Sequence, residues 1–190
     1  MSIMGWLSGL ALLIATPPNA APTTTATTST ATTTATPDAI VVIQERFRSI
    51  ETSSALVVST KDLAGLSLEG GTLKVWRAGK QIAKLDAHLF GEMWQSHETF
   101  YFDERDQLVF VHKVTTNYLE PFEPKGATVE EQRLYFAGDK LIRWIEAKDA
   151  QPVPLSDRRS IAVGAEARQR ARDFHAFARS KNATFKAARP

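Results

Sequence analysis

The sequence predicts an α+β domain in which a curved antiparallel β-sheet of about six strands, a meander of hairpins, packs with an N-terminal and a C-terminal amphipathic helix. Residues 72–146 contain short runs rich in Val, Ile, Phe, Tyr and Trp, separated by polar or glycine-bearing turns. Runs joined by such short turns must lie antiparallel. Residues 39–51 and 161–181, which flank this region, instead have apolar residues at helical spacing.

The first predicted helix covers residues 39–51. Its apolar residues recur every three or four positions and share one face: Ile40, Ile43, Phe47 and Ile50. Asp38 precedes them, and a carboxylate at that position accepts hydrogen bonds from the free amides of a first helical turn. The apolar stripe requires a sheet to lie on.

Three hairpins are predicted in the strand region. They pair residues 73–76 with 81–89, 99–102 with 108–116, and 133–136 with 141–146. Gly138 supplies the positive φ that the third turn requires. The second and third hairpins repeat one pattern, in which Phe100, Tyr101, Phe102, Leu108 and Val109 correspond to Leu134, Tyr135, Phe136, Leu141 and Ile142. We therefore expect these two hairpins to share one core.

The second predicted helix, residues 161–181, carries its apolar residues along one side: Val163, Ala167, Ala171, Phe174 and Ala178. We expect it to close the domain beside the first helix, with Glu166 and Arg170 forming a pair four residues apart. Three arginines lie away from the stripe: Arg168, Arg172 and Arg179. They predict a solvated helix face, and the alternative is a weak contact with an anionic surface. Nucleic acid is not expected as a partner of an exported chain.

The N-terminal segment predicts export. Residues 6–15 form an apolar run of signal-peptide length, too short to cross a bilayer, and small residues follow at Ala20 and Ala21. We expect a signal peptide at residues 1–21, a disordered Thr/Ala/Pro-rich tether at 22–38, a single α+β domain at 39–185 and a disordered tail at 186–190. After removal of the leader no transmembrane segment is expected. An uncleaved anchor or a buried terminus is the alternative.

The sequence contains no cysteine. Disulfides, thiolate metal sites, cysteine nucleophiles and a lipoprotein cysteine at the end of the leader are therefore excluded. Together with the leader, this composition predicts a secreted or periplasmic protein of bacterial type.

A resemblance supports this interpretation. The aromatic hairpins within residues 98–146, with Tyr101 and Phe102 in one and Tyr135 and Phe136 in the other, resemble a group of uncharacterised exported bacterial proteins that carry paired aromatic hairpins. The resemblance implies bacterial export and β-architecture. It implies no activity and no site residue.

No catalytic residue, cofactor or metal site is predicted. The glycine-flanked serine elbow and the phosphate-binding glycine loop are absent from the sequence, and no two histidines lie one helical turn apart. An alternative for the metal is that His88, His97 and His112 meet across neighbouring strands, with Glu92 or Glu98 nearby.

A binding surface is predicted on the sheet and one loop. Glu131, Arg133 and Tyr135 alternate onto one strand face, and Tyr101 takes the equivalent position in the second hairpin. An arginine beside tyrosines binds a carboxylate, a sugar or a partner loop, and the alternative is a cross-strand Glu–Arg pair on a solvated face. The predicted binding residues are Tyr101, Tyr118, Phe122, Arg133, Tyr135 and Arg143.

These observations favour an exported, non-enzymatic binding or accessory protein that contacts a protein, peptide or envelope polymer through a sheet face and a loop. For the stiff loop at residues 118–127, the alternative is that it folds back over an open end of the sheet. The competing functions are a hydrolase or metal-dependent enzyme with an unrecognised site, and a structural envelope protein.

Overall fold

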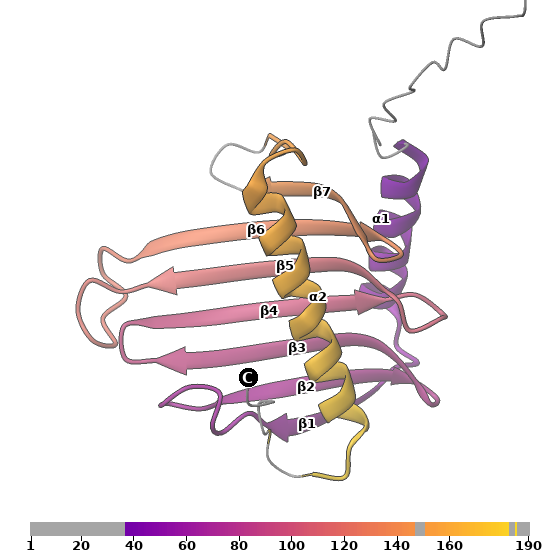
Figure 1. Cartoon of the computed structure of the whole chain (residues 1–190). Helices are drawn as coiled ribbons and strands as arrows, with labels where there is room; N and C mark the ends of the chain where they lie inside the picture. Colours follow the sequence, from indigo (N-terminus) through magenta and orange to yellow (C-terminus); the bar gives the residue numbers. More distant parts are fainter. Residues whose placement is uncertain (1–36, 147–150, 183–184, 186–190) are drawn as a thin grey trace, which may run out of the picture. The chain divides into compact units, whose positions relative to one another are not determined.

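The structure, a computed structural model, describes residues 37–146, 151–182 and 185, which fall within one compact unit. The expected leader, most of the tether and the C-terminal tail lie outside the described residues. One sheet contains seven antiparallel strands in chain order, with two helices (Figure 1). The elements are α1 (Pro37–Thr52), β1 (Val57–Asp62), β2 (Gly71–Ala78), β3 (Gln81–Gly91), β4 (Trp94–Phe102), β5 (Leu108–Asn117), β6 (Thr128–Ala137), β7 (Lys140–Glu146) and α2 (Arg158–Arg179).

The expected α+β meander and both helices are confirmed, but the number of strands is seven and not six. The missed strand is β1, which pairs only with β2 at the edge of the sheet. Its residues are almost all exposed, so it lacks the apolar alternation that marks a half-buried strand. Helix α1 begins at Pro37, so residues 37 and 38 belong to it and not to a tether.

Each face of the sheet has its own apolar cluster and its own helix. The larger cluster joins Phe100, Phe136 and Trp144 of the strands to Phe174 and Phe177 of α2. The smaller cluster joins Tyr101, Phe110 and Tyr135 to the predicted stripe of α1. The expectation that the two helices lie side by side is therefore wrong, and the sheet is the middle of three layers (Figure 1).

Both helices run across the strands, and they differ in how much they cover (Figure 1). With 22 residues α2 is about 33 Å long, and the seven strands span about 29 Å from the first to the last. Helix α2 thus crosses the whole sheet. Helix α1, with 16 residues, packs near the end where the β2–β3, β4–β5 and β6–β7 turns lie.

The three hairpins repeat one irregularity. The strand register shifts just before the turn of each, at Trp76/Arg77, Tyr101/Phe102 and Tyr135/Phe136. The extra residue on each returning strand is Ala83, Val109 or Ile142, and all three join the α1 cluster. Such bulges bend a strand and increase its twist. The sequence correspondence between the second and third hairpins therefore reflects a shared bulge, which the first hairpin also has.

Charged side chains fasten α2 to the sheet. Lys61 of β1 donates to the carbonyl oxygens of Phe177 and Ser180 at 2.7 and 2.6 Å, which places a cation at the C-terminus of the helix. In the middle of the sheet, Arg170 pairs with the buried Glu98 of β4 at 2.5 Å. The sequence predicts Glu166 as the partner of Arg170, one turn away on the same helix. The structure instead has an ion pair that joins the helix to the sheet.

Candidate functional site

Among the described residues, only one end of the α1 face of the sheet is covered, by α1. Beyond α1 the strands β3 to β6 carry polar side chains on this face, in two rows set by the strand register. One row contains Asp86, Thr99, His112 and Arg133, and the next contains His88, His97, Val114 and Glu131. We call these two rows the polar rows. Because they lie on rigid, paired strands, their side chains have fixed neighbours.

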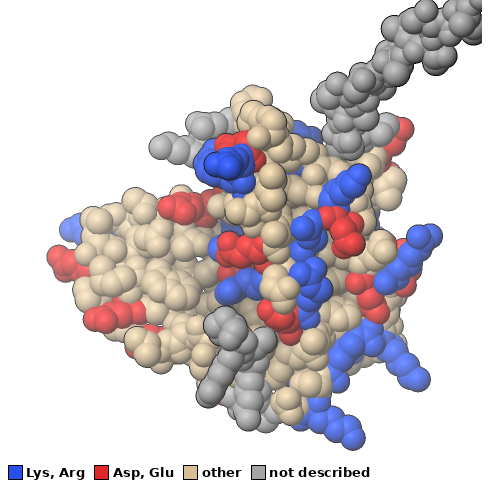
Figure 2. All heavy atoms as spheres, viewed as in Figure 1, with Lys and Arg blue, Asp and Glu red and all other residues tan. Residues whose placement is uncertain are grey.

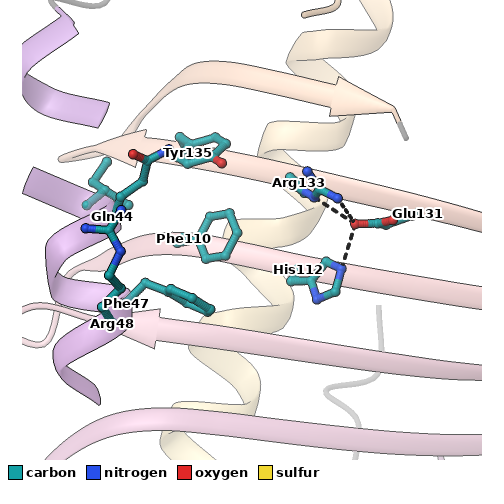
Figure 3. A pocket seen from close by; sticks show the side chains of 9 residues that line it. Gln44, Phe47, Arg48, Phe110, His112, Glu131, Arg133 and Tyr135 are labelled. Atoms are coloured by element: carbon teal, nitrogen blue, oxygen red, sulfur yellow. Dashed lines mark hydrogen bonds and ion pairs between the residues drawn. The ribbon is translucent and has the colours of Figure 1, made fainter. Parts of the chain in front are cut away.

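A pocket lies where α1 meets the polar rows. Its cavity has a volume of about 340 Å³. Figure 3 shows the side chains that line it. Phe47, Phe110 and Tyr135 give it aromatic walls, and the ring centroids of Phe110 and Tyr135 lie 4.8 Å apart. Arg48 on α1 and Arg133 on β6 bring two guanidinium groups to its lining. The pocket thus combines ring surfaces with cations, which suits a ligand that has an apolar part and a negative charge.

Glu131 connects the polar groups of the pocket. Its Oε1 atom accepts hydrogen bonds from Arg133 Nε at 2.7 Å and lies 3.0 Å from His112 Nε2 (Figure 3). Burial would raise the pKa of this carboxyl, but the hydrogen bonds and charges of Arg133 and His112 lower it below its usual range. Glu131 is therefore a stable anion that orients its two partners. The Glu–Arg pair lies along β6, whereas the alternative given for this face has it across two strands.

Tyr101 and Tyr135 flank Phe110 in one row under α1. The Tyr101 hydroxyl donates to Glu51 Oε1 at 2.9 Å, and the same oxygen lies 2.6 Å from Lys84 Nζ. Burial first, and then the hydrogen bond to Glu51, raise the pKa of Tyr101 well above its usual range. Tyr101 is thus a buried structural residue that joins α1 to the sheet, and Tyr135 is the tyrosine that lines the pocket.

A second group of polar residues lies on β3 and β4. His88 and His97 are direct cross-strand partners, and their ring centroids lie 4.1 Å apart. Asp86 Oδ1 lies 2.6 Å from His97 Nε2. One ligand atom from each of these three residues lies within 4.8 Å of the others. Glu98 is absent from this group because it points to the α2 face, and His112, on the next strand, interacts with Glu131 instead.

The structure separates the predicted binding residues into two places. Tyr101, Arg133, Tyr135 and Arg143 lie at or next to the α1 end of the sheet, where Arg143 is the cross-strand partner of Tyr135. Arg143 is partly buried, and its Nε atom has no hydrogen-bond partner among the described residues. Tyr118 and Phe122 follow β5 at the opposite end (Figure 1). One groove containing both groups is therefore not formed.

The loop that carries Phe122 lies against the β3–β4 turn. The Phe122 amide donates to the carbonyl oxygen of Glu92 at 3.0 Å, and its φ of 57° is in the left-handed region. Its side chain remains 62% exposed. Phe90 near the end of β3 and Met93 in the neighbouring turn are also exposed. The backbone of this loop thus lies against the β3–β4 turn while Phe122 stays exposed, and partner recognition by the loop stays a prediction.

The three arginines of α2 singled out in the sequence, Arg168, Arg172 and Arg179, each have a hydrogen-bond partner. Arg179 lies 2.5 Å from Asp106, and Arg168 donates to the backbone oxygen of Asp139. Arg172 donates to Gln169 on the same helix at 2.7 Å. Figure 2 shows blue and red side chains interleaved over this face. Among the described residues, Arg179 is the only one of the three that is bonded to a carboxylate, so contact with an anionic surface through these arginines stays a prediction.

Sequence reasoning missed Gln44 and Arg48 on α1, which line the pocket. The available signal was their spacing, since residues four apart on a helix lie on one side, and both lie beside the apolar stripe. It also left Asp86 out of the histidine group. Asp86 and His88 are two residues apart on a strand, so alternation already places them on one face.

The fold and the polar rows define a class of structure: a seven-stranded antiparallel meander with one helix on each face and one face half open. Comparisons with protein-family models, curated proteins and solved structures found no match to this chain. In the part of the chain that the structure describes, neither helix has the length and apolar character needed to cross a membrane.

Proposed function

We propose that this chain is an exported, non-enzymatic binding module that takes a carboxylate-bearing segment of a protein or peptide into the pocket between α1 and the sheet. The observation that carries the proposal is that Arg48, Arg133 and the aromatic walls line one cavity of about 340 Å³. Pockets of about 300 Å³ and above are of the size that holds a small ligand.

The polar groups of the pocket favour binding over acid–base chemistry. A general acid or base works best with a pKa near the ambient pH, and the pKa of Glu131 is lowered, away from that range. Glu131 instead holds Arg133 in place, with Arg133 Nη2 at 2.6 Å. An arginine that is already oriented loses less conformational entropy when a carboxylate binds.

Arg48 supplies the positive charge of the pocket that no carboxylate of the described residues neutralises. Arg133 is neutralised in part by Glu131, whereas Arg48 has no ion pair among the described residues. It is exposed at the rim of the pocket, one helical turn from Gln44. The lining contains two guanidinium groups on different elements and one carboxylate, Glu131, which contacts Arg133 and His112. The pocket therefore keeps a net attraction for anions.

The test uses two ligands that differ in charge alone: N-acetylphenylalanine, which has a carboxylate, and N-acetylphenylalaninamide, which has none. Amide NMR signals of the full-length protein are followed during titration with each. We expect the acid to shift signals of Gln44, Arg48 and Arg133, with the amide bound about tenfold more weakly, because a charge-assisted hydrogen bond contributes about 1.5–3 kcal/mol and exposure reduces it.

Arg48→Gln and Arg133→Gln should each weaken binding of the acid by about tenfold, as expected for one charged hydrogen bond. Arg158→Gln is the matched control, because Arg158 is exposed at the start of α2 on the opposite side of the sheet. Equal binding of acid and amide, shifts confined to other surfaces, or no binding of either ligand would contradict the proposal.

Export is tested separately. The intact mass of protein recovered from the envelope or medium of the producing cell should correspond to a chain that begins at residue 22. A full-length chain found in the cytosol alone would contradict this part of the proposal and leave the binding pocket unaffected.

A further inference from the structure

The group formed by Asp86, His88 and His97 lies in the open polar rows, outside the pocket. His88 and His97 face each other across β3 and β4, and Asp86 is on the same face, two residues before His88. The two rings meet edge to face at 4.1 Å between centroids. Cross-strand partners have Cβ atoms about 4.5–5.5 Å apart, so the two imidazoles leave the same face of the sheet side by side.

The donor set is that of a transition-metal site. Two imidazole nitrogens and one carboxylate oxygen bind Zn²⁺, Cu²⁺, Ni²⁺ and Fe²⁺, whereas Mg²⁺ and Ca²⁺ prefer oxygen donors alone. Around zinc, ligand atoms at about 2.0–2.2 Å in a tetrahedron lie roughly 3.3 Å from one another. The three ligand atoms here lie within 4.8 Å of one another, and the closest pair is at 2.6 Å. Small side-chain rotations therefore bring them to the metal distance.

The surroundings make the arrangement rigid and accessible. Both strands are paired on each side, β3 with β2 and β4 with β5, so the histidines cannot separate without disrupting the sheet. His97 retains 46% of its side-chain exposure, which gives an ion a path to the site. The rings of Phe90 and His88 lie roughly perpendicular to each other, with 5.9 Å between their centroids.

We propose that Asp86, His88 and His97 bind a divalent transition-metal ion of the zinc, copper and nickel class, with the remaining coordination positions open to water. This site goes beyond the proposed function, because it shares no residue with the anion pocket. It also differs from the prediction of no metal. That prediction used spacing along a helix. The alternative stated with it, that His88, His97 and His112 meet across strands, has His88 and His97 together, and the third residue is Asp86 in place of His112.

The test is isothermal titration of the untagged full-length protein with ZnCl₂ in a buffer free of organic carboxylates. We expect one ion per chain. His88→Ala and His97→Ala should each reduce the affinity at least tenfold, and Asp86→Asn should reduce it several-fold because the amide keeps the shape and loses the charge. His175→Gln is the matched control, since that histidine lies on α2 across the sheet, and it should bind zinc as the unaltered chain does.

A second measurement keeps the test valid if a variant fails to fold. Addition of a small fraction of Cu²⁺ to the unaltered protein should broaden the amide signals of Asp86, His88 and His97 before others. No zinc binding by the unaltered protein up to about millimolar concentration, unchanged affinity in the His88 and His97 variants, or broadening centred on another region would overturn the proposal. None of these results would affect the carboxylate titration, so the two proposals fail independently.

Discussion

Replacement of Glu98 by glutamine removes a negative charge from the contact between α2 and the sheet. The Glu98 side chain is only 3% exposed, with Arg170 Nε at 2.5 Å from one oxygen and Ser96 Oγ at 3.2 Å from the other. Lys113 Nζ lies 3.8 Å away. Without the carboxylate two cations face a neutral amide, and we expect the protein to lose stability for that reason.

The size of the loss follows from burial. Removal of one partner from a buried ion pair costs about 3–5 kcal/mol, because the other charge is left without compensation. Arg170 and Lys113 retain 31% and 33% of their side-chain exposure, so water replaces part of the lost interaction. We therefore expect a loss near the lower limit, about 3 kcal/mol. With a urea m-value of about 1.5 kcal/mol/M, the unfolding midpoint falls by about 2 M.

The assay is urea unfolding of the full-length protein, followed by tryptophan fluorescence, with a double-mutant cycle that adds Arg170→Gln. Glu166→Gln is the control, because Glu166 is exposed on the same helix, and it should change the free energy of unfolding by less than about 0.5 kcal/mol. A coupling energy between Glu98 and Arg170 below about 0.5 kcal/mol would refute the reasoning, since that value is typical of a surface pair.

Two further predictions concern the attachment of the helices. Lys61→Met keeps the aliphatic stem but removes the donor to the carbonyl oxygens of Phe177 and Ser180. We expect the free energy of unfolding to fall by about 1 kcal/mol and Tm, measured by calorimetry, by about 3 °C. An unchanged Tm would show that these hydrogen bonds do not stabilise the protein. For Tyr101 the raised pKa means that its contribution to stability is complete below the unfolded pKa of about 10 and is lost as pH rises above it. Tyr101→Phe should therefore lessen the fall in Tm between about pH 9 and pH 11, and parallel curves for the two proteins would contradict this.

The sequence predicted the hairpins and helices because each has a local signal. Alternation and short turns mark β2 to β7, and helical spacing marks the stripes that pack in α1 and α2. It did not predict β1, whose exposed valines and polar residues look like a loop until they pair with β2. The side on which each helix packs was also missed. The run Phe100-Tyr101-Phe102 contained that information, because consecutive apolar residues indicate a strand buried on both faces.

The candidate sites required the strand register. Alternation alone placed Arg133 and Tyr135 on one face, and the structure has them there. The meeting of His88 with His97 depends on the turn between Gly91 and Trp94, since a shift of one residue would place one of them on the other face. Arg48 joined the pocket only through the packing of α1 on that face. Local patterns thus determine which face a residue takes, and the register and tertiary packing determine its neighbours.

The change of side-chain character along the strands explains why half of one face is open. Under α1 the cross-strand row is aromatic, with Tyr101, Phe110 and Tyr135, and the following rows become charged or polar where the helix no longer covers them. An apolar partner that covered the open rows would bury their charged groups. Burial of unpaired charges is unfavourable, so such a partner would require apolar side chains in these rows. The uncovered rows instead hold paired carboxylates, histidines and an arginine at fixed distances. Such groups remain hydrated until an ion or a charged ligand replaces the water, so the chemistry of the open half favours ions and anionic segments over an apolar protein surface.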